Sequence, residues 1–372
     1  MKLQLRGNPL GIEITDTHIK FCELRASGNK MQVKRYATVE LQEGTMNDGR
    51  IQDELKLLQT LRQALNSYPW STRNVHFAIP SQTVMVRFLK MPDVNVKELR
   101  KIVDFEIKNN IHLPFDDPHY DFVKLGPKEA ARKSKKTDAQ AFQQQWEAAA
   151  AKEPASTNPF ASSGEGSEDI PTNMCDIMLV AASMELLQQY VRIFEELGLR
   201  ISSFEIKAFS LNRLQHLTKI VPSYELSLLV DVGSTNCDLT IVLDGVIQIT
   251  RNVPISFMAQ QTQSTDALDR MFADFLPQTV SYDSSFNDMV GEMERLMNFY
   301  RYTLNHREAE FHKVVVTGDI PMLDELIAYM SSRMNPRIVA AAWSNLEIER
   351  GQQAWDLSAY AVPLGLCLRR GR

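Results

Sequence analysis

A unit of apolar strand, polar turn and alternating strand occurs twice along this chain. Residues 11–24 read GIEITDTHIKFCEL, and residues 229–242 read LVDVGSTNCDLTIV. Alternation of apolar and polar positions around a short polar turn predicts antiparallel strands. A further turn and a third strand follow in each copy, over 31–41 and 246–255. The copies lie 218 residues apart, a spacing too long for a solenoid, so we expect two related lobes.

Helical spacing of apolar positions marks four further segments. Asn95, followed three residues later by Glu98, has the pattern of a capping box and predicts a helix that ends at 113–115. Residues 184–197 show an amphipathic pattern that ends at Gly198, a residue type common after helices. Two more helices are predicted, over 289–303 and 322–330.

Residues 126–173 differ in composition from the rest of the chain. The segment is rich in Lys, Gln, Ala, Glu, Ser and Pro and poor in branched apolar residues. Such a segment cannot bury enough apolar surface to offset the entropy of ordering it. We therefore expect a disordered insert in a surface loop, with the strands on either side paired with each other. A second interpretation is a docking segment that contacts a partner through Phe142 and Trp146.

Length and charge narrow the class of protein. The chain has 372 residues, which predicts two lobes or domains rather than a single core. The net charge is −5 and the Lys and Arg residues are dispersed, so we expect no direct binding to nucleic acid or anionic lipid. The histidines lack the spacing of metal ligands, so we expect no metal centre built from them.

The cysteines and the apolar runs indicate where the protein works. Cys22, Cys175, Cys237 and Cys367 include no C-x-x-C pair and lie in apolar surroundings, which predicts buried, reduced thiols. The N-terminus does not resemble a signal peptide, and no apolar run approaches the roughly 18–20 residues that span a bilayer. We expect a cytoplasmic protein that reaches a membrane only through a partner.

The turn after the first strand of the second copy has the composition of a phosphate-binding turn. Backbone N–H groups of Gly233, Ser234 and Thr235 would form a nest for phosphate oxygens, and Asp231 would orient Mg²⁺ through its waters. The alternative is a plain hairpin turn that needs glycine for its geometry. The first copy of the unit favours the phosphate interpretation, because two facing turns would form a clamp. The matching residues there are Glu13, Thr15, Asp16, Thr17 and Lys20.

Two later segments complete a candidate nucleotide site. A buried Val-Val-Val strand leads into Thr317, Gly318 and Asp319, and a small turn at this place can admit an adenine ring or a ribose. Glu292 and Arg295 lie on one side of a predicted helix, where they would meet a ribose hydroxyl and an adenine face, respectively. The alternative for this pair is a solvated helix face.

In these features the chain resembles the PilM family of type IV pilus assembly proteins, which are actin-like ATPases related to the cell-division protein FtsA. Five stretches carry the resemblance, and their joint order is more specific than any one of them. They are GIEITDTHIKFCEL, LLVDVGSTNCDLTIVLDGVIQITRNVPI, EMERLMNFYRY, VVVTGDIPMLDEL and AYAVPLGLCLR. The resemblance implies an α/β, actin-like (ribonuclease H-like) fold of two lobes with an inserted small FtsA-type subdomain.

The resemblance also implies an organisation and a role. PilM-like proteins bind ATP between their lobes and bind the cytoplasmic tail of the membrane protein PilN beside the small subdomain. We therefore expect a cytoplasmic scaffold, peripheral at the inner face of the cytoplasmic membrane, whose partners are a PilN-like N-terminal peptide, other pilus assembly proteins and further copies of itself. The expected parts are a first lobe at 1–83 and 200–220 with the C-terminal helix 355–369, a small subdomain at 84–125 and 174–199, the insert at 126–173, and a second lobe at 221–354.

The first phosphate turn departs from the family pattern. The family has D-x-G-S there, whereas this chain has E-I-T-D from Glu13 to Asp16. A carboxylate therefore lies where phosphate would approach, and like charges repel strongly once water is excluded. Asp319 also stands where the family usually has a second glycine. These changes predict a degenerate site in which ATP and Mg²⁺ bind weakly or not at all, and a protein that is not an efficient ATPase.

Two other functions stay open from the sequence. An active ATPase or small-molecule kinase of this fold would need an acid to activate water or a hydroxyl, and Glu13 and Asp231 are the candidates. An FtsA-like, membrane-associated filament protein would carry a C-terminal amphipathic helix after a linker. Here the residues LRRGR follow an apolar helix directly, so we rank this function third.

Overall fold

The structure is a computed structural model, and it divides the chain into two compact units. Unit 1 comprises Met1–Met85, Phe115–His119 and Ala182–Arg372, and unit 2 comprises Val86–Pro114 and Tyr120–Ala181. The expected disordered insert at 126–173, with its alternative docking role, lies outside the described residues. The described residues are 9–27, 30–125, 174–222, 224–258, 282–341, 346–348 and 354–369.

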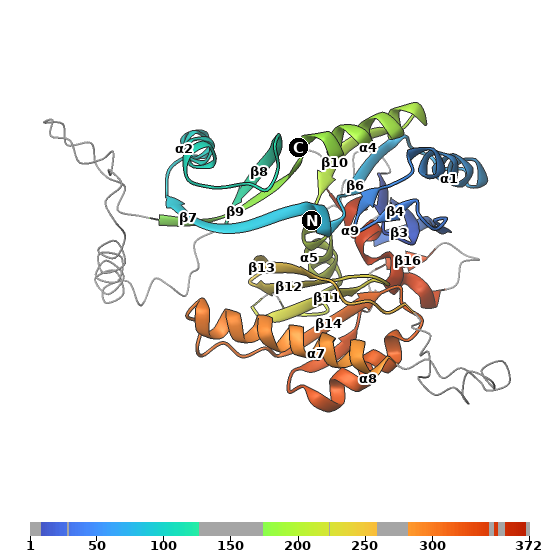
Figure 1. Cartoon of the computed structure of the whole chain (residues 1–372). Coiled ribbons are helices and arrows are strands. Elements are labelled where there is room, and N and C mark those ends of the chain that lie inside the picture. The colour runs from blue at the N-terminus through green and yellow to red at the C-terminus, as the bar shows by residue number, and fades with distance from the viewer. Residues whose placement is uncertain are drawn as a thin grey trace, which may run out of the picture. The chain divides into compact units, whose positions relative to one another are not determined.

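The first copy of the repeated unit forms the centre of a six-stranded sheet in unit 1 (Figure 1). The strand order is β10-β6-β1-β2-β3-β16, and β1 pairs antiparallel with β2 and parallel with β6. Every residue of β1 is buried, so this strand has a covered position on both faces. The strands are β1 (Leu10–Ile14), β2 (His18–Ser27), β3 (Lys30–Glu40), β6 (Asn74–Ala78), β10 (Arg200–Glu205) and β16 (Leu346–Ile348).

Helices cover both faces of this sheet because its strands are apolar on both sides. Helices α1 (Glu54–Ser67) and α4 (Met184–Glu196) pack against Leu10, Ile12 and Ile14. Helix α9 (Ala361–Cys367) contacts β1, β2 and β6, and it follows a 3₁₀ helix, η4 (Ala354–Tyr360). A Cβ atom on Gly11 would lie 2.2 Å from the carbonyl oxygen of Pro363, so glycine is what permits α9 to approach β1.

The second copy forms the centre of a five-stranded sheet with the order β13-β12-β11-β14-β15. Strand β11 pairs antiparallel with β12 and parallel with β14, as β1 does with β2 and β6. The predicted repeat is therefore present as two sheets with the same central pairing. The strands are β11 (Ser227–Val232), β12 (Cys237–Leu243), β13 (Val246–Val253), β14 (Lys313–Gly318) and β15 (Arg337–Ala340).

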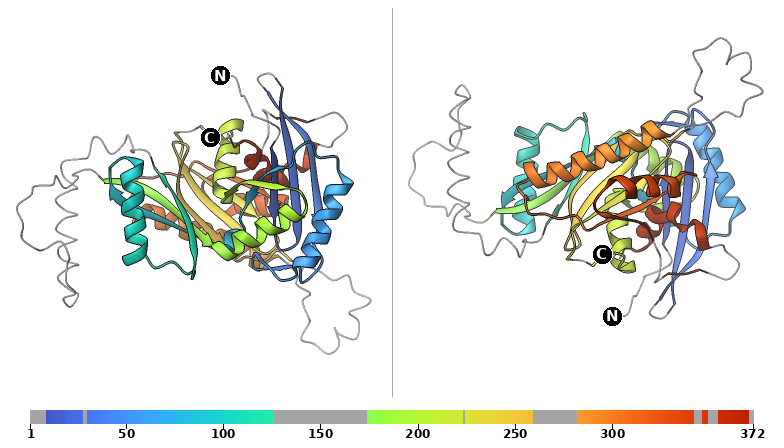
Figure 2. Two further views of the ribbon diagram at one scale, coloured as in Figure 1. Left: turned by 90° about the horizontal axis from the view of Figure 1, so that it is seen from above. Right: turned by 90° about the horizontal axis from the view of Figure 1, so that it is seen from below.

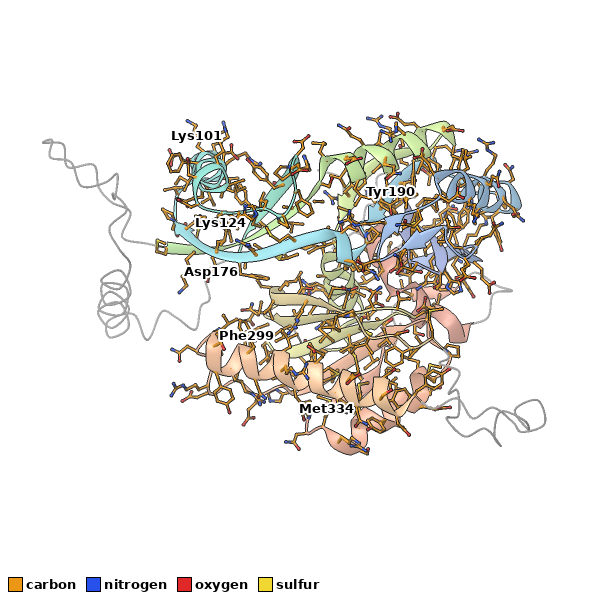
Figure 3. All side chains as sticks on the ribbon, viewed as in Figure 1. Lys101, Lys124, Asp176, Tyr190, Phe299 and Met334 are labelled. Atoms are coloured by element: carbon orange, nitrogen blue, oxygen red, sulfur yellow. The ribbon has the colours of Figure 1, made fainter. Side chains whose placement is uncertain are left out.

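Helices also flank the five-stranded sheet (Figures 1 and 2). Helix α7 (Asp283–Asn298) buries Met289, Met293 and Leu296 in one core with strands β11, β12 and β14. It continues as a π-helix over Phe299–Thr303, and Phe299 is labelled at this end in Figure 3. Helix α8 (Leu323–Arg333) joins the same core, and α5 (Lys207–Thr218) contacts β12 and β13.

Unit 2 is a three-stranded sheet with one helix. The strand order is β7-β9-β8, so the two strands that flank the insert are neighbours, as we expected. Asn95 caps α2 by accepting hydrogen bonds from the amides of Lys97 and Glu98. A small apolar core joins the helix to the strands. The elements are β7 (Val84–Pro92), α2 (Val96–Asn109), β8 (Pro118–Lys124) and β9 (Met174–Ser183).

The expected bounds of the small subdomain differ from the units of the structure. We assigned residues 174–199 to the small subdomain, but Ala182 onwards belongs to unit 1. The reason is that α4 packs Tyr190, Ile193 and Phe194 into the core of the six-stranded sheet. An amphipathic pattern shows which face of a helix is buried, and it does not show against which sheet.

Candidate functional site

The two turns of the repeated unit have the same internal hydrogen bond. The amide of Thr15 donates to the carbonyl of His18 at 2.9 Å, and the amide of Gly233 donates to the carbonyl of Asn236 at 3.0 Å. A Cβ atom on Gly233 would lie 2.9 Å from that carbonyl oxygen, so the turn needs glycine there. The turns differ from the expected nest, because the Gly233 amide already has an acceptor inside its own turn.

Asp16 joins the first turn to the second. Its Oδ1 accepts a hydrogen bond from the amide of Gly49 at 2.9 Å, and its Oδ2 accepts one from the hydroxyl of Thr235 at 3.1 Å. We predicted this carboxylate to stand where phosphate would approach. Both of its oxygens have donors from within the chain, and one of these donors belongs to the other turn of the expected clamp.

Lys20 on β2 forms the second link between the two sheets. Its Nζ lies 2.7 Å from Oδ2 of Asp319, which follows β14, and 3.7 Å from Oε2 of Glu13 on β1. The Lys20 side chain is 6% exposed and that of Asp319 is 10% exposed, so water screens this pair poorly.

Lys207, at the start of α5, gathers three more carboxylates. Its Nζ lies 2.9 Å from Oε1 of Glu13, 3.3 Å from Oδ2 of Asp231 and 3.4 Å from Oδ2 of Asp238. Sequence reasoning missed both Lys207 and Asp238. The central cluster, as we name it from here on, consists of Glu13, Lys20, Lys207, Asp231, Asp238 and Asp319.

Burial and nearby anions act in opposite directions on the pKa values of the two lysines. Burial alone lowers the pKa of Lys20, but the charges of Glu13, Asp319 and Asp231 outweigh it, so the pKa lies above its ordinary value. The same balance, with Glu13, Asp231 and Asp238 as the anions, holds the pKa of Lys207 well above its ordinary value. Both ammonium groups therefore stay charged at neutral pH.

The pKa values of Asp231 and Asp319 are shifted in opposite directions. Burial raises the pKa of Asp231 to about 7, with Lys207 opposing the shift and Glu13 adding to it. Burial also disfavours the charge on Asp319, but Lys20 outweighs that effect and lowers the pKa of this carboxyl below its ordinary value. Asp319 is therefore the firmly ionised partner of Lys20, whereas Asp231 can hold a proton near neutral pH.

Gly318 fixes the position of Asp319. It has a φ of +153°, and a Cβ atom there would lie 2.2 Å from the carbonyl oxygen of Val232. The amide of Asp319 donates to the same carbonyl at 3.1 Å. The close approach of β14 to β11 thus brings the carboxylate of Asp319 to Lys20.

The remaining turn residues of the predicted site bond to neighbours in the chain. The Thr15 hydroxyl caps its own turn by accepting from the amide of His18, and the Thr17 hydroxyl pairs with the His18 ring. The Ser234 carbonyl accepts from the amide of Phe257, and the Thr317 hydroxyl donates to the carbonyl of Ser358. These contacts stabilise the turns from within the chain.

The predicted ribose and adenine contacts bind each other on α7. Arg295 and Glu292 form an ion pair, and Oε2 of Glu292 lies 3.5 Å from Nη1 of Arg251 on β13. The side chain of Arg295 is 68% exposed. Their ion pairs run to each other and to β13 rather than to the central cluster, and the side chain of Glu292 is only 16% exposed.

The arrangement does not fit a phosphate group or a hydrated Mg²⁺ ion as it stands. Lys20 is neutralised by Asp319, and Asp16 places a carboxylate between the two turns. The ammonium of Lys207 lies against Asp231, the predicted Mg²⁺ residue, and would repel a divalent cation there. Within the described ranges, no group of three or more His, Cys, Asp or Glu side chains is arranged to hold a metal ion.

Burial is confirmed for all four cysteines, which are free thiols. Cys367 on α9 donates to the carbonyls of Pro9 and Cys22, at 3.3 and 3.0 Å.

Among the helices that the structure describes, none is both long enough and apolar enough to cross a bilayer.

The pair of sheets with matching central strands, joined at their turns, defines a protein of the actin-like fold. Residues 11–143 match the family model described as type IV pilus assembly protein PilM. This match confirms the resemblance inferred from the sequence, and the predicted α/β, actin-like fold is confirmed with it. No curated protein matches the chain.

Solved structures resemble this chain over nearly its whole length. The PilM–PilN type IV pilus biogenesis complex contains a chain that is 17% identical, with 98% of each chain covered and a TM-score of 0.71. The ethanolamine utilization protein EutJ from Carboxydothermus hydrogenoformans is 9% identical, with 98% of this chain and 91% of that chain covered and a TM-score of 0.47. MreB5 of Spiroplasma citri bound to ADP is 9% identical, with 96% and 95% covered and a TM-score of 0.41.

Proposed function

We propose that this protein is a scaffold of type IV pilus assembly that binds the cytoplasmic tail of a PilN-like membrane protein. The observation that carries the proposal is the likeness to the PilM chain of the PilM–PilN complex, which covers 98% of both chains. The family match over 11–143 supports it independently. In this proposal the protein lies in the cytoplasm, is held at the inner face of the membrane by its partner, and also contacts other pilus assembly proteins and further copies of itself.

Titration calorimetry tests the scaffold role. The ligand is a synthetic peptide with the sequence of the N-terminal tail of the PilN-like protein from the same organism, and the control is the same residues in scrambled order. We expect saturable heat with the first peptide and only dilution heat with the second. Equal heats for the two peptides, or no heat at high concentration, would reject the scaffold role.

We further propose that the nucleotide site of this protein is degenerate. Three contacts support this: Lys20 pairs with Asp319, Asp16 accepts from Thr235, and Lys207 lies against Asp231. The Lys20 ammonium, the Asp16 carboxylate and the Asp231 carboxylate thus each have a partner in the chain. ATP and Mg²⁺ would bind weakly or not at all, and the protein would not be an efficient ATPase.

Nucleotide affinity, measured with and without Mg²⁺, tests the degenerate site. The wild type is compared with a Thr15→Gly, Asp16→Ser double variant that restores the first turn to the family pattern. We expect little or no binding by the wild type and a gain in affinity in the double variant. Tight binding of Mg-ATP by the wild type would reject this part of the proposal and leave the peptide result standing.

A further inference from the structure

The ion pair of Lys20 and Asp319 is one of the contacts that connect the two sheets. Lys20 belongs to β2 of the six-stranded sheet, and Asp319 follows β14 of the five-stranded sheet. Their charged atoms are 2.7 Å apart, and both side chains are at most one tenth exposed. A buried ammonium group is costly unless an anion neutralises it, so Lys20 needs a partner at this place.

Asp319 forms the shorter of the two ion pairs with Lys20. The other carboxylate near Lys20 is Glu13, whose Oε2 lies 3.7 Å from Nζ, and Glu13 is shared with Lys207 at 2.9 Å. Of the two contacts with Lys20, the one from Asp319 is thus shorter, and it is not divided with a second lysine. Oδ1 of Asp319 is buried without a hydrogen-bond partner, so this carboxylate is placed for its charge rather than for a full set of hydrogen bonds.

Asp16 likewise connects separate parts of the chain through its carboxylate, at the turn between β1 and β2. Its carboxylate accepts from Gly49 beside β5 (Arg50–Ile51) and from Thr235 between β11 and β12. A carboxylate of the chain therefore receives donors from two separate segments, as an oxyanion bound between them would. In each case the anion that joins the two sheets is an aspartate of the protein itself.

We propose that Asp319 is a built-in anion that takes the place of a bound phosphate group beside Lys20 and holds the two sheets together without a ligand. This inference rests on the degenerate site of the proposed function. It adds that Asp319 is the residue that excludes phosphate from the site. The positive charge that would attract phosphate is present in Lys20, and Asp319 cancels it. Phosphate recognition by a lysine is an attraction to a point charge, so cancelling the charge removes it.

The consequence is that a phosphate site can be uncovered by one substitution. Asp319→Gly removes the carboxylate and leaves the ammonium of Lys20 facing the vacated space. Inorganic phosphate then supplies the missing negative charge, whereas the wild type has no place for it. The substitution removes a side chain from the turn and adds none.

Hydrogen exchange of the two turns, at residues 15–18 and 233–236, tests the inference in the full chain. In the wild type we expect slow exchange that inorganic phosphate does not change. In Asp319→Gly we expect exchange at both turns to be about tenfold faster or more, because a buried link between the sheets is lost. Adding inorganic phosphate at constant ionic strength should slow the exchange of this variant again.

Two further variants keep the test decisive. Asp319→Asn retains the shape without the charge and should also exchange faster than the wild type, which covers the case in which Asp319→Gly fails to fold. Lys20→Met with Asp319→Gly should show no response to phosphate, because the attracting charge is gone. Unchanged exchange in both single variants, or a phosphate response that survives Lys20→Met, overturns the inference. Tight ATP binding by the wild type would instead reject the degenerate site on which it rests.

Discussion

Lys20 and Asp319, which lie near opposite ends of the chain, form a buried ion pair with 2.7 Å between Nζ and Oδ2. The pair joins β2 of the six-stranded sheet to the residue that follows β14 of the five-stranded sheet. Breaking a buried pair by removing one partner leaves the other charge uncompensated, at a cost of roughly 3–5 kcal/mol. The stability of unit 1 should therefore depend on both residues.

Lys20→Met should lower the free energy of unfolding by about 3–5 kcal/mol, because it leaves the buried carboxylate of Asp319 without its ion-pair partner. Chemical denaturation measures the change. The matched control is Lys56→Met, since Lys56 pairs with Asp53 at 3.8 Å on an exposed surface and should matter by about 0.5 kcal/mol or less. Equal effects of the two substitutions would contradict the account.

Gly318→Ala should destabilise the fold far more than the same substitution at another glycine that has a positive φ. Gly198 has a φ of +68°, and no atom lies within 4 Å of the place that an added Cβ atom would take, so Gly198→Ala should cost about 1 kcal/mol. Gly318→Ala adds a collision with the Val232 carbonyl and should cost at least about 2 kcal/mol more. Thermal unfolding of the two variants, side by side, decides between this order and its reverse.

Asp231 should make stability fall as the pH rises from about 5 to about 7. The folded pKa of about 7 is above the unfolded value, so the folded state holds the extra proton in this window and loses that advantage above it. The slope is at most about 1.4 kcal/mol per pH unit for one proton. The groups that face Asp231 are Glu13, Lys20, Lys207 and Asp238.

Asp231→Asn mimics the protonated form and should flatten that slope. Denaturation midpoints of the wild type and the variant are compared at several pH values between 5 and 8. The denaturation midpoint of the variant should rise relative to that of the wild type as the pH rises. Parallel pH profiles would show that Asp231 does not titrate in this range.

Arg295→Ala should change the stability of the fold little, because Arg295 is 68% exposed and pairs with Glu292 on α7. Exposed pairs contribute about 0–1 kcal/mol. We expect the denaturation midpoint to move by less than for any substitution in the central cluster. A loss comparable to that of Lys20→Met would indicate a role for α7 that the contacts do not explain.

Local patterns predicted the repeated unit and most helices correctly, because their signals lie within a few residues. Asn95 caps α2, and Gly198 follows α4 with a positive φ, as their sequence positions indicated. The packing of α4 on the six-stranded sheet could not be read in this way, since it depends on a partner surface distant in the chain. The same limit applied to the boundary between the two units.

The central cluster was visible in part from the sequence. Glu13, Lys20, Asp231 and Asp319 were noticed because they stand at motif positions. Lys207, the partner of Glu13 and Asp231, lies at the start of an ordinary helix and was missed. Asp238 did carry a signal that was missed: it is a charged residue inside the buried strand Cys237–Leu243. A charge in such a strand needs a counter-charge, which would have pointed to a buried lysine.

The most direct test of the account is calorimetric titration of the nucleotide-free wild type with the PilN-like N-terminal peptide, repeated in the presence of Mg-ATP. A scaffold whose sheets are joined by its own ion pairs needs no nucleotide to bind its partner. We therefore predict saturable binding with the same affinity in both titrations. Binding that appears only with Mg-ATP, or no binding in either titration, would contradict the account.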